Sequence, residues 1–414
     1  MRKSVVFALL LIVLVPGVPW TSAQSVGDVL TPWTPGTLDI HQINTGRGNS
    51  TFMIFPDGTT MLLDAGAGGN PPPRGTAPLP NASRAPGEWI ARYVRRMLPH
   101  DSSARLDYAY LTHFHADHMG SLGTTAKTSA SGKYKLTGIT EVGETLPIGK
   151  MIDRAWPDYS YPAALDDPMM ENYRGFLKWQ SENKGLKVER LQPGRNDQIT
   201  LLRDRQRYPN FEVRNVAANG EIWTGVATNT RRHFPSLEGL SNEDRPTENM
   251  CSLAIRLSYG RFDYFSGGDM PGAPPEGSPI WHDVETPVAQ AVGPVEACIL
   301  NHHGNRDSMN AFFVSALRPQ VFIIPVWSAD HPGHTVLARL LSKRLFPESR
   351  DLFATNMMEA NKIVIGPMLD QLRSSQGHIL LRVAPGGDSF RVIILDDSAE
   401  TSQIKSVHGP YLSR

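Results

Sequence analysis

The sequence contains only two cysteines among its 414 residues, too few for a framework of disulfide bonds. Cys251 and Cys298 each lie in an apolar stretch that is typical of a strand. We expect two buried thiols. A single disulfide between neighbouring strands is the alternative, and the sequence does not decide between the two.

The sequence also lacks an excess of charge. Its 41 basic and 41 acidic residues balance, and a hydrophobic content of 40% with 20% charged residues indicates a globular chain. A near-neutral chain has no general attraction to nucleic acid or anionic lipid, which leaves local basic patches as the only such contacts.

After residue 23, the chain has no apolar run long enough to span a membrane. Before it, Arg2 and Lys3 precede the apolar residues 5–15, and small residues lead to Ala23. This order predicts a signal peptide over residues 1–23 and a mature protein that is secreted or periplasmic, without a stable membrane anchor. Cleavage would remove two basic and no acidic residues, leaving a net charge of about −2.

Strand patterns lie towards both ends of the chain. Residues 24–414 are expected to form one α/β domain in which two sheets pack face to face with helices outside. Strands are expected at residues 37–43, 50–55, 59–63, 106–111, 252–257, 261–266, 297–300, 321–325, 378–383 and 390–395. Helices are expected at residues 88–98, 310–317 and 335–345.

Residues 121–247 form a long polar stretch that Gly and Pro interrupt. One helix is expected around residues 169–183, and little else resembles core. We expect an insertion that covers or shapes a site, with a separate domain as the alternative.

Shortly after the strand at 106–111, four potential metal ligands lie within six residues: His113, His115, Asp117 and His118. In a loop leaving a strand, all four side chains can turn towards a pair of cations. Neutral imidazole and carboxylate are ligands that borderline divalent metals prefer. The run therefore predicts a metal site.

A site for two metals needs a further carboxylate between the ions and later histidines. Asp269 follows the apolar strand at 261–266, and His302 and His303 follow the strand at 297–300. These three residues are the candidates.

The run at residues 113–118 resembles the HxHxDH signature of the metallo-β-lactamase superfamily. The chain is similar in particular to the extracellular metallo-hydrolase domain of ComEC-type competence DNA-uptake proteins. The matching blocks, in order, are residues 43–50, 62–66, 106–120, 249–257, 265–269, 301–305 and 331–337. The resemblance covers about residues 37–395 and leaves most of 121–247 unmatched.

This resemblance implies a four-layer αββα sandwich with a long insertion. It also implies that His113 and His115 bind one metal ion, that Asp117 and His118 bind a second, and that Asp269 bridges the two.

One histidine of the pair after the strand at 297–300 would complete the second site. His303 is favoured, with His302 as the alternative. Asp64 would orient a histidine, and His331 would lie at the mouth as a proton donor or a phosphate contact.

The sequence departs from the pattern of the family at three positions, where Asn49, Ser121 and Asn305 replace an aspartate, a glycine and a serine. No histidine clearly supplies a third ligand to the first metal. His233 and, less favourably, His282 are candidates.

Together these features predict a hydrolase with two divalent cations, Zn²⁺ or alternatively Mn²⁺ or Fe²⁺, that activate a water molecule. Asp117 would steer the nucleophile and His331 would protonate the leaving oxygen. The resemblance favours a phosphodiester such as DNA as substrate. Another ester, an amide or a lactam is the alternative, and so is a protein that keeps the metal site without catalysis.

The sequence gives DNA binding little support. Seven basic residues of the 121–247 stretch are interspersed with acidic ones, so a solvated face is expected there rather than a DNA groove. They are Lys187, Arg190, Arg195, Arg203, Arg205, Arg207 and Arg214.

Overall fold

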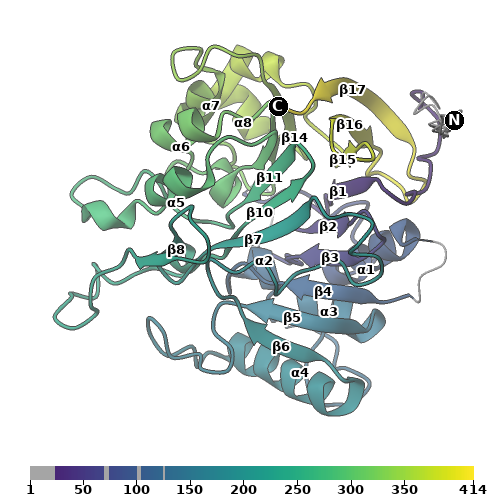
Figure 1. Ribbon diagram of the computed structural model, residues 1–414. Helices are drawn as coiled ribbons and strands as arrows, with labels where there is room; N and C mark the ends of the chain where they lie inside the picture. The colour runs from purple at the N-terminus through teal and green to yellow at the C-terminus, as the bar shows by residue number, and fades with distance from the viewer. Residues whose placement is uncertain (1–23, 70–73, 100–103, 125) are drawn as a thin grey trace, which may run out of the picture.

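The computed structural model describes residues 24–69, 74–99, 104–124 and 126–414. Two large mixed sheets with helices around them make an α/β sandwich (Figure 1). The predicted signal peptide lies outside the described residues. Within the described ranges, no helix is both long and apolar enough to cross a membrane.

The first sheet has nine strands in the described part of the chain. Their order is β17 (Ile404–Leu412), β16 (Ser389–Leu395), β15 (His378–Val383), β1 (Leu38–Gln42), β2 (Thr51–Ile54), β3 (Thr60–Leu63), β4 (Leu106–Tyr110), β5 (Ile148–Asp153) and β6 (Lys187–Arg190). Strands β3 to β6 run parallel to one another. Their carboxyl ends therefore share one edge of the sheet.

The second sheet has eight strands among the described residues. Their order is β14 (Asp351–Ala354), β13 (Val321–Ile324), β12 (Ala297–Ile299), β11 (Phe262–Ser266), β10 (Ala254–Tyr259), β7 (Phe211–Ala218), β8 (Glu221–Trp223) and β9 (Thr230–Arg232). Strands β11 to β14 are parallel, and β10 pairs antiparallel with both β11 and β7.

The described residues contain eight α-helices. They are α1 (Pro86–Met97), α2 (Ala116–Met119), α3 (Gly138–Thr145), α4 (Pro168–Lys184), α5 (Glu285–Val292), α6 (Ala311–Leu317), α7 (His334–Leu341) and α8 (Glu359–Ile365). Helix α4 shows why they begin and end where they do. The Asp167 side chain accepts hydrogen bonds from the backbone N–H groups of Met169 and Met170, and Gly185 ends the helix in the left-handed conformation at φ 73°.

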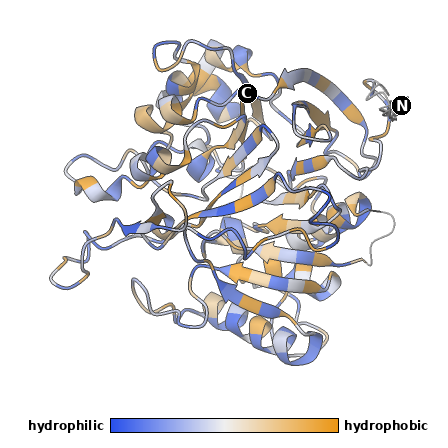
Figure 2. Ribbon diagram, viewed as in Figure 1, coloured by the Kyte–Doolittle hydropathy of each residue, from blue (hydrophilic) through white to orange (hydrophobic). Residues whose placement is uncertain are grey.

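Alternation along the strands assigns side chains to different cores. In β2, Met53 joins a cluster made from both sheets, whereas Phe52 and Ile54 join a cluster with α1, α3 and α4. A third cluster joins the outer face of the second sheet to α5, α6 and α7. Figure 2 shows the resulting bands of apolar residues along the strands. The two sheets therefore pack against each other, and helices cover their outer faces.

The expectation of little core within residues 121–247 is wrong. Strands β5 and β6 extend the first sheet from β4, and β7 lies between β10 and β8 in the second sheet. The buried residues of β5 and β7, such as Met151 and Val213, belong to the hydrophobic clusters. Polar residues are interleaved with these apolar ones, which hid the strand pattern. The domain boundaries stay a prediction.

Both cysteines are buried and free. Cys298 lies on β12, and Cys251 lies in the short 3-10 turn before β10. The structure therefore has the two thiols and not the alternative disulfide.

Candidate metal centre

The candidate ligands come from the carboxyl ends of strands in both sheets. The chain leaves β4 at Tyr110 and carries the histidine run into α2, while Asp269 follows β11 and His303 follows β12. Backbone hydrogen bonds join these loops: Leu253 N–H donates to Thr112 O at 2.9 Å, and His302 N–H donates to Gly268 O at 3.1 Å. The fold thus brings together residues that are far apart in the sequence.

Two groups of side chains at this edge could hold a metal ion. One consists of Asp117, His118, Asp269 and His303, and the other of His113, His115 and Asp269. Within each group the ligand atoms lie within 4.8 Å of one another. Asp269 belongs to both groups.

In the first group the imidazole nitrogens and carboxylate oxygens converge. His118 Nε2 lies 3.1 Å from Asp269 Oδ1 and 3.2 Å from His303 Nε2. His303 Nε2 lies 3.1 Å from Asp117 Oδ2. In the second group His113 Nε2 lies 3.1 Å from His115 Nδ1 and 3.8 Å from Asp269 Oδ2.

The outer nitrogens of two of these histidines are held by acceptors. His303 Nδ1 lies 2.9 Å from the Pro325 carbonyl oxygen, which can only accept, so Nδ1 carries the proton. His118 Nδ1 lies 2.7 Å from Asp64 Oδ2 in the same manner. When the ring is neutral, each Nε2 therefore turns its lone pair towards the cluster, which is the tautomer that binds metals.

The donor set fits a divalent cation. Asp269 is only 2% exposed, and His113, His118 and His303 are 0–1% exposed. Burial opposes the charge of Asp269, but His118 and His303 lower its pKa well below the usual value, so it is ionised. Buried carboxylates among imidazoles are surroundings in which a divalent cation can take the place of the imidazole protons as the positive charge.

His302 lies beside the cluster but outside both groups. Its Nδ1 lies 2.7 Å from Asp307 Oδ1, and its Nε2 lies 3.3 Å from Asn249 Nδ2 and 3.8 Å from Asp269 Oδ2. Of the two adjacent histidines, the structure places His303 in a ligand group.

His331 stacks on the ring of His303, with ring centroids 4.7 Å apart and an interplanar angle of 15°. Burial, and then His303, lower the pKa of His331 to about 3. Its ring is therefore neutral at pH 7. The sequence offers His331 as a proton donor or a phosphate contact, and its role stays a prediction.

The structure does not bring the candidates for a third histidine to the centre. His233 Nε2 lies 3.0 Å from the Asp283 carbonyl oxygen, and His282 Nε2 lies 3.1 Å from the Asp244 carbonyl oxygen. Within the described residues, the group around His113 and His115 therefore has two histidines and one carboxylate.

The matching blocks at residues 43–50 and 62–66, which precede the histidine run in the sequence, pack directly against it. Asp64, in the left-handed region at φ 60°, accepts hydrogen bonds from the Thr112 N–H and hydroxyl, both at 2.8 Å. A Cβ at Gly48 or at Gly66 would lie 2.1 Å from the Asp117 carbonyl oxygen, so only glycine fits at either position. The predicted contact between Asp64 and a histidine is confirmed.

The sequence did not predict a buried carboxylate that holds the backbone of the histidine run. The Glu248 carboxylate accepts from the Phe114 N–H at 2.9 Å and from Arg154 Nε at 2.7 Å. The Arg154 guanidinium also lies 4.8 Å from the centroid of the Phe114 ring. No local sequence pattern links residues 114, 154 and 248. The one signal was that Glu248 immediately precedes the matching block at residues 249–257.

No protein-family model and no curated protein matches this chain.

Proposed function

We propose that this protein is a secreted or periplasmic metal-dependent hydrolase with the four-layer αββα fold of the metallo-β-lactamase superfamily. The proposal includes two divalent cations and a phosphodiester substrate, of which DNA is one example. The observation that carries it is the pair of ligand groups that share Asp269. A shared carboxylate is the feature that distinguishes a two-metal centre from a single structural site.

The two ligand groups would hold the cations, and the chemistry that these supply when bound is an activated water molecule and a polarised scissile group. The chain's own residues have separate roles. Asp64 and the Pro325 carbonyl hold the protons of His118 and His303 on Nδ1. Asp117, which is less buried than Asp269, offers a carboxylate oxygen on the side from which a nucleophile would approach.

His331 supports a phosphoryl substrate. Its Nδ1 is buried and has no hydrogen-bond partner among the residues that the structure describes. A buried ring nitrogen without a partner is costly, and with its proton on Nδ1 the His331 ring would donate to a bound phosphoryl oxygen. His331 is thus proposed to contact the substrate rather than to act as the acid.

The first test is the metal content of the purified protein together with hydrolysis of bis(p-nitrophenyl) phosphate, with Zn²⁺, Mn²⁺ or Fe²⁺ supplied. We expect two metal ions per chain and turnover. His115→Ala should lower both. His334→Ala, which removes an exposed histidine from α7, is the matched control.

Each outcome points to a different conclusion. Two metals without turnover would favour an ester, amide or lactam substrate, or a centre without catalysis. Absence of bound metal would refute the proposal.

A further inference from the structure

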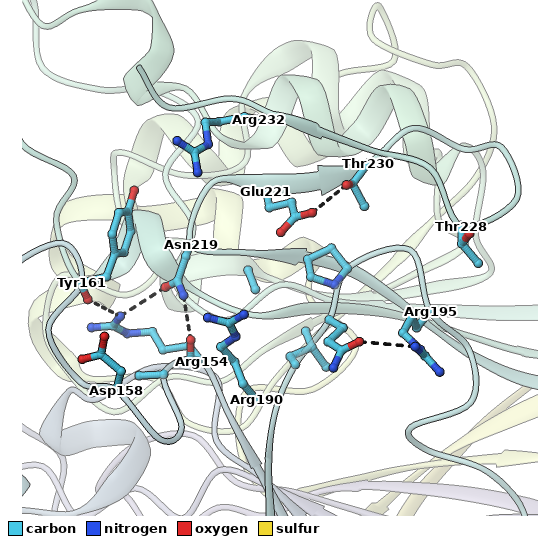
Figure 3. A pocket seen from close by; sticks show the side chains of 15 residues that line it. Arg154, Asp158, Tyr161, Arg190, Arg195, Asn219, Glu221, Thr228, Thr230 and Arg232 are labelled. Atoms are coloured by element: carbon cyan, nitrogen blue, oxygen red, sulfur yellow. Dashed lines mark hydrogen bonds between the residues drawn. The ribbon is translucent and has the colours of Figure 1, made fainter. Parts of the chain in front are cut away.

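A cavity of about 800 Å³ lies at the same edge of the first sheet as the metal centre. Its walls come from the ends of β5 and β6, the turn between β7 and β8, and β9. Figure 3 shows it from close by, with Arg190 and Arg232 extending into it from opposite sides. We call this cavity the arginine pocket.

The arginine pocket carries an excess of positive charge in a chain that is otherwise neutral. Four arginines line it (Arg154, Arg190, Arg195 and Arg232), against two acidic residues, Asp158 and Glu221. Glu221 accepts a hydrogen bond from the Thr230 hydroxyl. The cavity thus concentrates guanidinium groups, whose planar forks match oxyanions such as phosphate.

Two of the four arginines are already neutralised. Arg154 pairs with Glu248, and Arg195 pairs with Asp197. Arg190 and Arg232 are exposed, and no carboxylate in the described part of the chain forms an ion pair with either. These two side chains therefore hold the charge that is free to bind an anion.

The pocket lies close to the metal centre. Strand β4, which leads to the ligands, and β6, which ends at Arg190, are separated by β5 alone, so their ends lie about 10 Å apart. Arg154 joins the two places directly, because it lines the pocket and binds the same Glu248 carboxylate that holds Phe114 N–H. One extended ligand could reach both.

Two other arginines of residues 121–247 have carboxylate partners of their own. Arg203 binds Asp107 Oδ2 at 2.8 Å, at the amino end of β4 and thus at the opposite edge of the sheet. Arg214 pairs with Glu212. The charge of these two arginines is therefore paired, whereas Arg190 and Arg232 form no ion pair within the described residues.

We propose that the arginine pocket binds a second phosphate of a substrate whose scissile phosphodiester lies at the metal centre. The inference rests on the proposed function and narrows its substrate class to a chain with several phosphates, of which a single-stranded oligonucleotide is the simplest. A mononucleotide or a small diester would fill the metal centre and leave the pocket empty.

The test compares a fluorescent single-stranded oligonucleotide with bis(p-nitrophenyl) phosphate, using the Arg190→Ala/Arg232→Ala double variant. The matched control is Arg231→Ala, the preceding residue on β9, whose guanidinium binds the Pro287 carbonyl and Gln290 on α5. We expect kcat/KM for the oligonucleotide to fall about tenfold or more in the double variant and to stay unchanged in the control. Turnover of the small diester should be unchanged in both.

Binding measured by fluorescence anisotropy gives a readout that does not need turnover. Loss of this one phosphate contact should make the slope of log affinity against log salt about 0.7 less steep. Unchanged oligonucleotide affinity in the double variant would overturn the inference. So would a parent protein that hydrolyses the small diester but does not bind the oligonucleotide, or equal competition by polyglutamate.

A parent protein that hydrolyses neither substrate but binds the oligonucleotide through Arg190 and Arg232 would refute the proposed function and leave the pocket assignment standing. The two proposals therefore fail separately.

Discussion

The ion pair between Arg154 and Glu248 links the metal centre to the arginine pocket, and its removal has a calculable cost. The Arg154 side chain is fully buried, and Glu248 is 15% exposed. In a Glu248→Ala variant, Arg154 would keep only the Tyr161 carbonyl and the Asn219 amide oxygen as acceptors. A buried charge left without its counterion costs about 3–5 kcal/mol.

The same substitution leaves the Phe114 N–H without its acceptor, which costs about 1–3 kcal/mol more if no water replaces it. We expect the free energy of unfolding, measured by urea denaturation, to fall by about 3–5 kcal/mol at least. Metal affinity should fall as well, because Phe114 lies between His113 and His115.

The matched control is Asp197→Ala, which breaks the pair with Arg195, whose two side chains are 49% and 50% exposed. Such a surface pair is worth about 0–1 kcal/mol. If Glu248→Ala does not fold, Glu248→Gln keeps one acceptor and should lose less. A loss below about 1 kcal/mol for Glu248→Ala, equal to that of the control, would refute the reasoning.

Three further predictions follow from the buried groups. Asp64→Asn should lower metal affinity about 10- to 100-fold in a chelator competition, because the proton on His118 Nδ1 loses its charged acceptor; an unchanged affinity would contradict this role. Removing metal with a chelator should lower the melting temperature of the parent protein more than that of His115→Ala, because the buried carboxylates then lose their cation; equal shifts would contradict it. Burial raises the pKa of Glu285 to about 7, against the opposing hydrogen bonds from Asn310, Asn301 and Met309. The folded state therefore holds the proton more tightly than the unfolded state. Stability from this group is full below about pH 4.5 and is lost as the pH rises towards 7, by about 3 kcal/mol. Unfolding of the parent and of Glu285→Gln at pH 5 and pH 7.5 should show this fall in the parent only.

The sequence alone predicted the elements whose pattern is local. Strands expected at residues 37–43, 50–55 and 59–63 correspond to β1, β2 and β3, and the helix expected at 169–183 corresponds to α4. These segments have a clear period of apolar residues or a capping residue at their ends, so each is specified by its own neighbours. The histidine run was equally visible, because four ligands within six residues are a local pattern.

Tertiary structure decided which distant residues meet. Strands β5 and β7 contain charged residues, and the sequence pattern did not predict them as strands. Parallel pairing with β4 places β5 in the first sheet, and antiparallel pairing with β10 places β7 in the second. The resemblance favoured His303 over His302, but the surroundings of each ring come from the fold, which places His302 beside Asn249 and Asp307 and His303 beside the Pro325 carbonyl.

Tertiary structure also decided that Asp269 belongs to both ligand groups and that the arginines line one cavity. Asp269 meets the histidine run because β11 and β4 end at facing edges of two different sheets. Arg154, Arg190 and Arg232 come from three strands and converge only because β5, β6 and β9 end around one cavity. Local sequence specifies an element through neighbouring residues, whereas a site depends on strand order, which is set by packing between residues far apart in the chain.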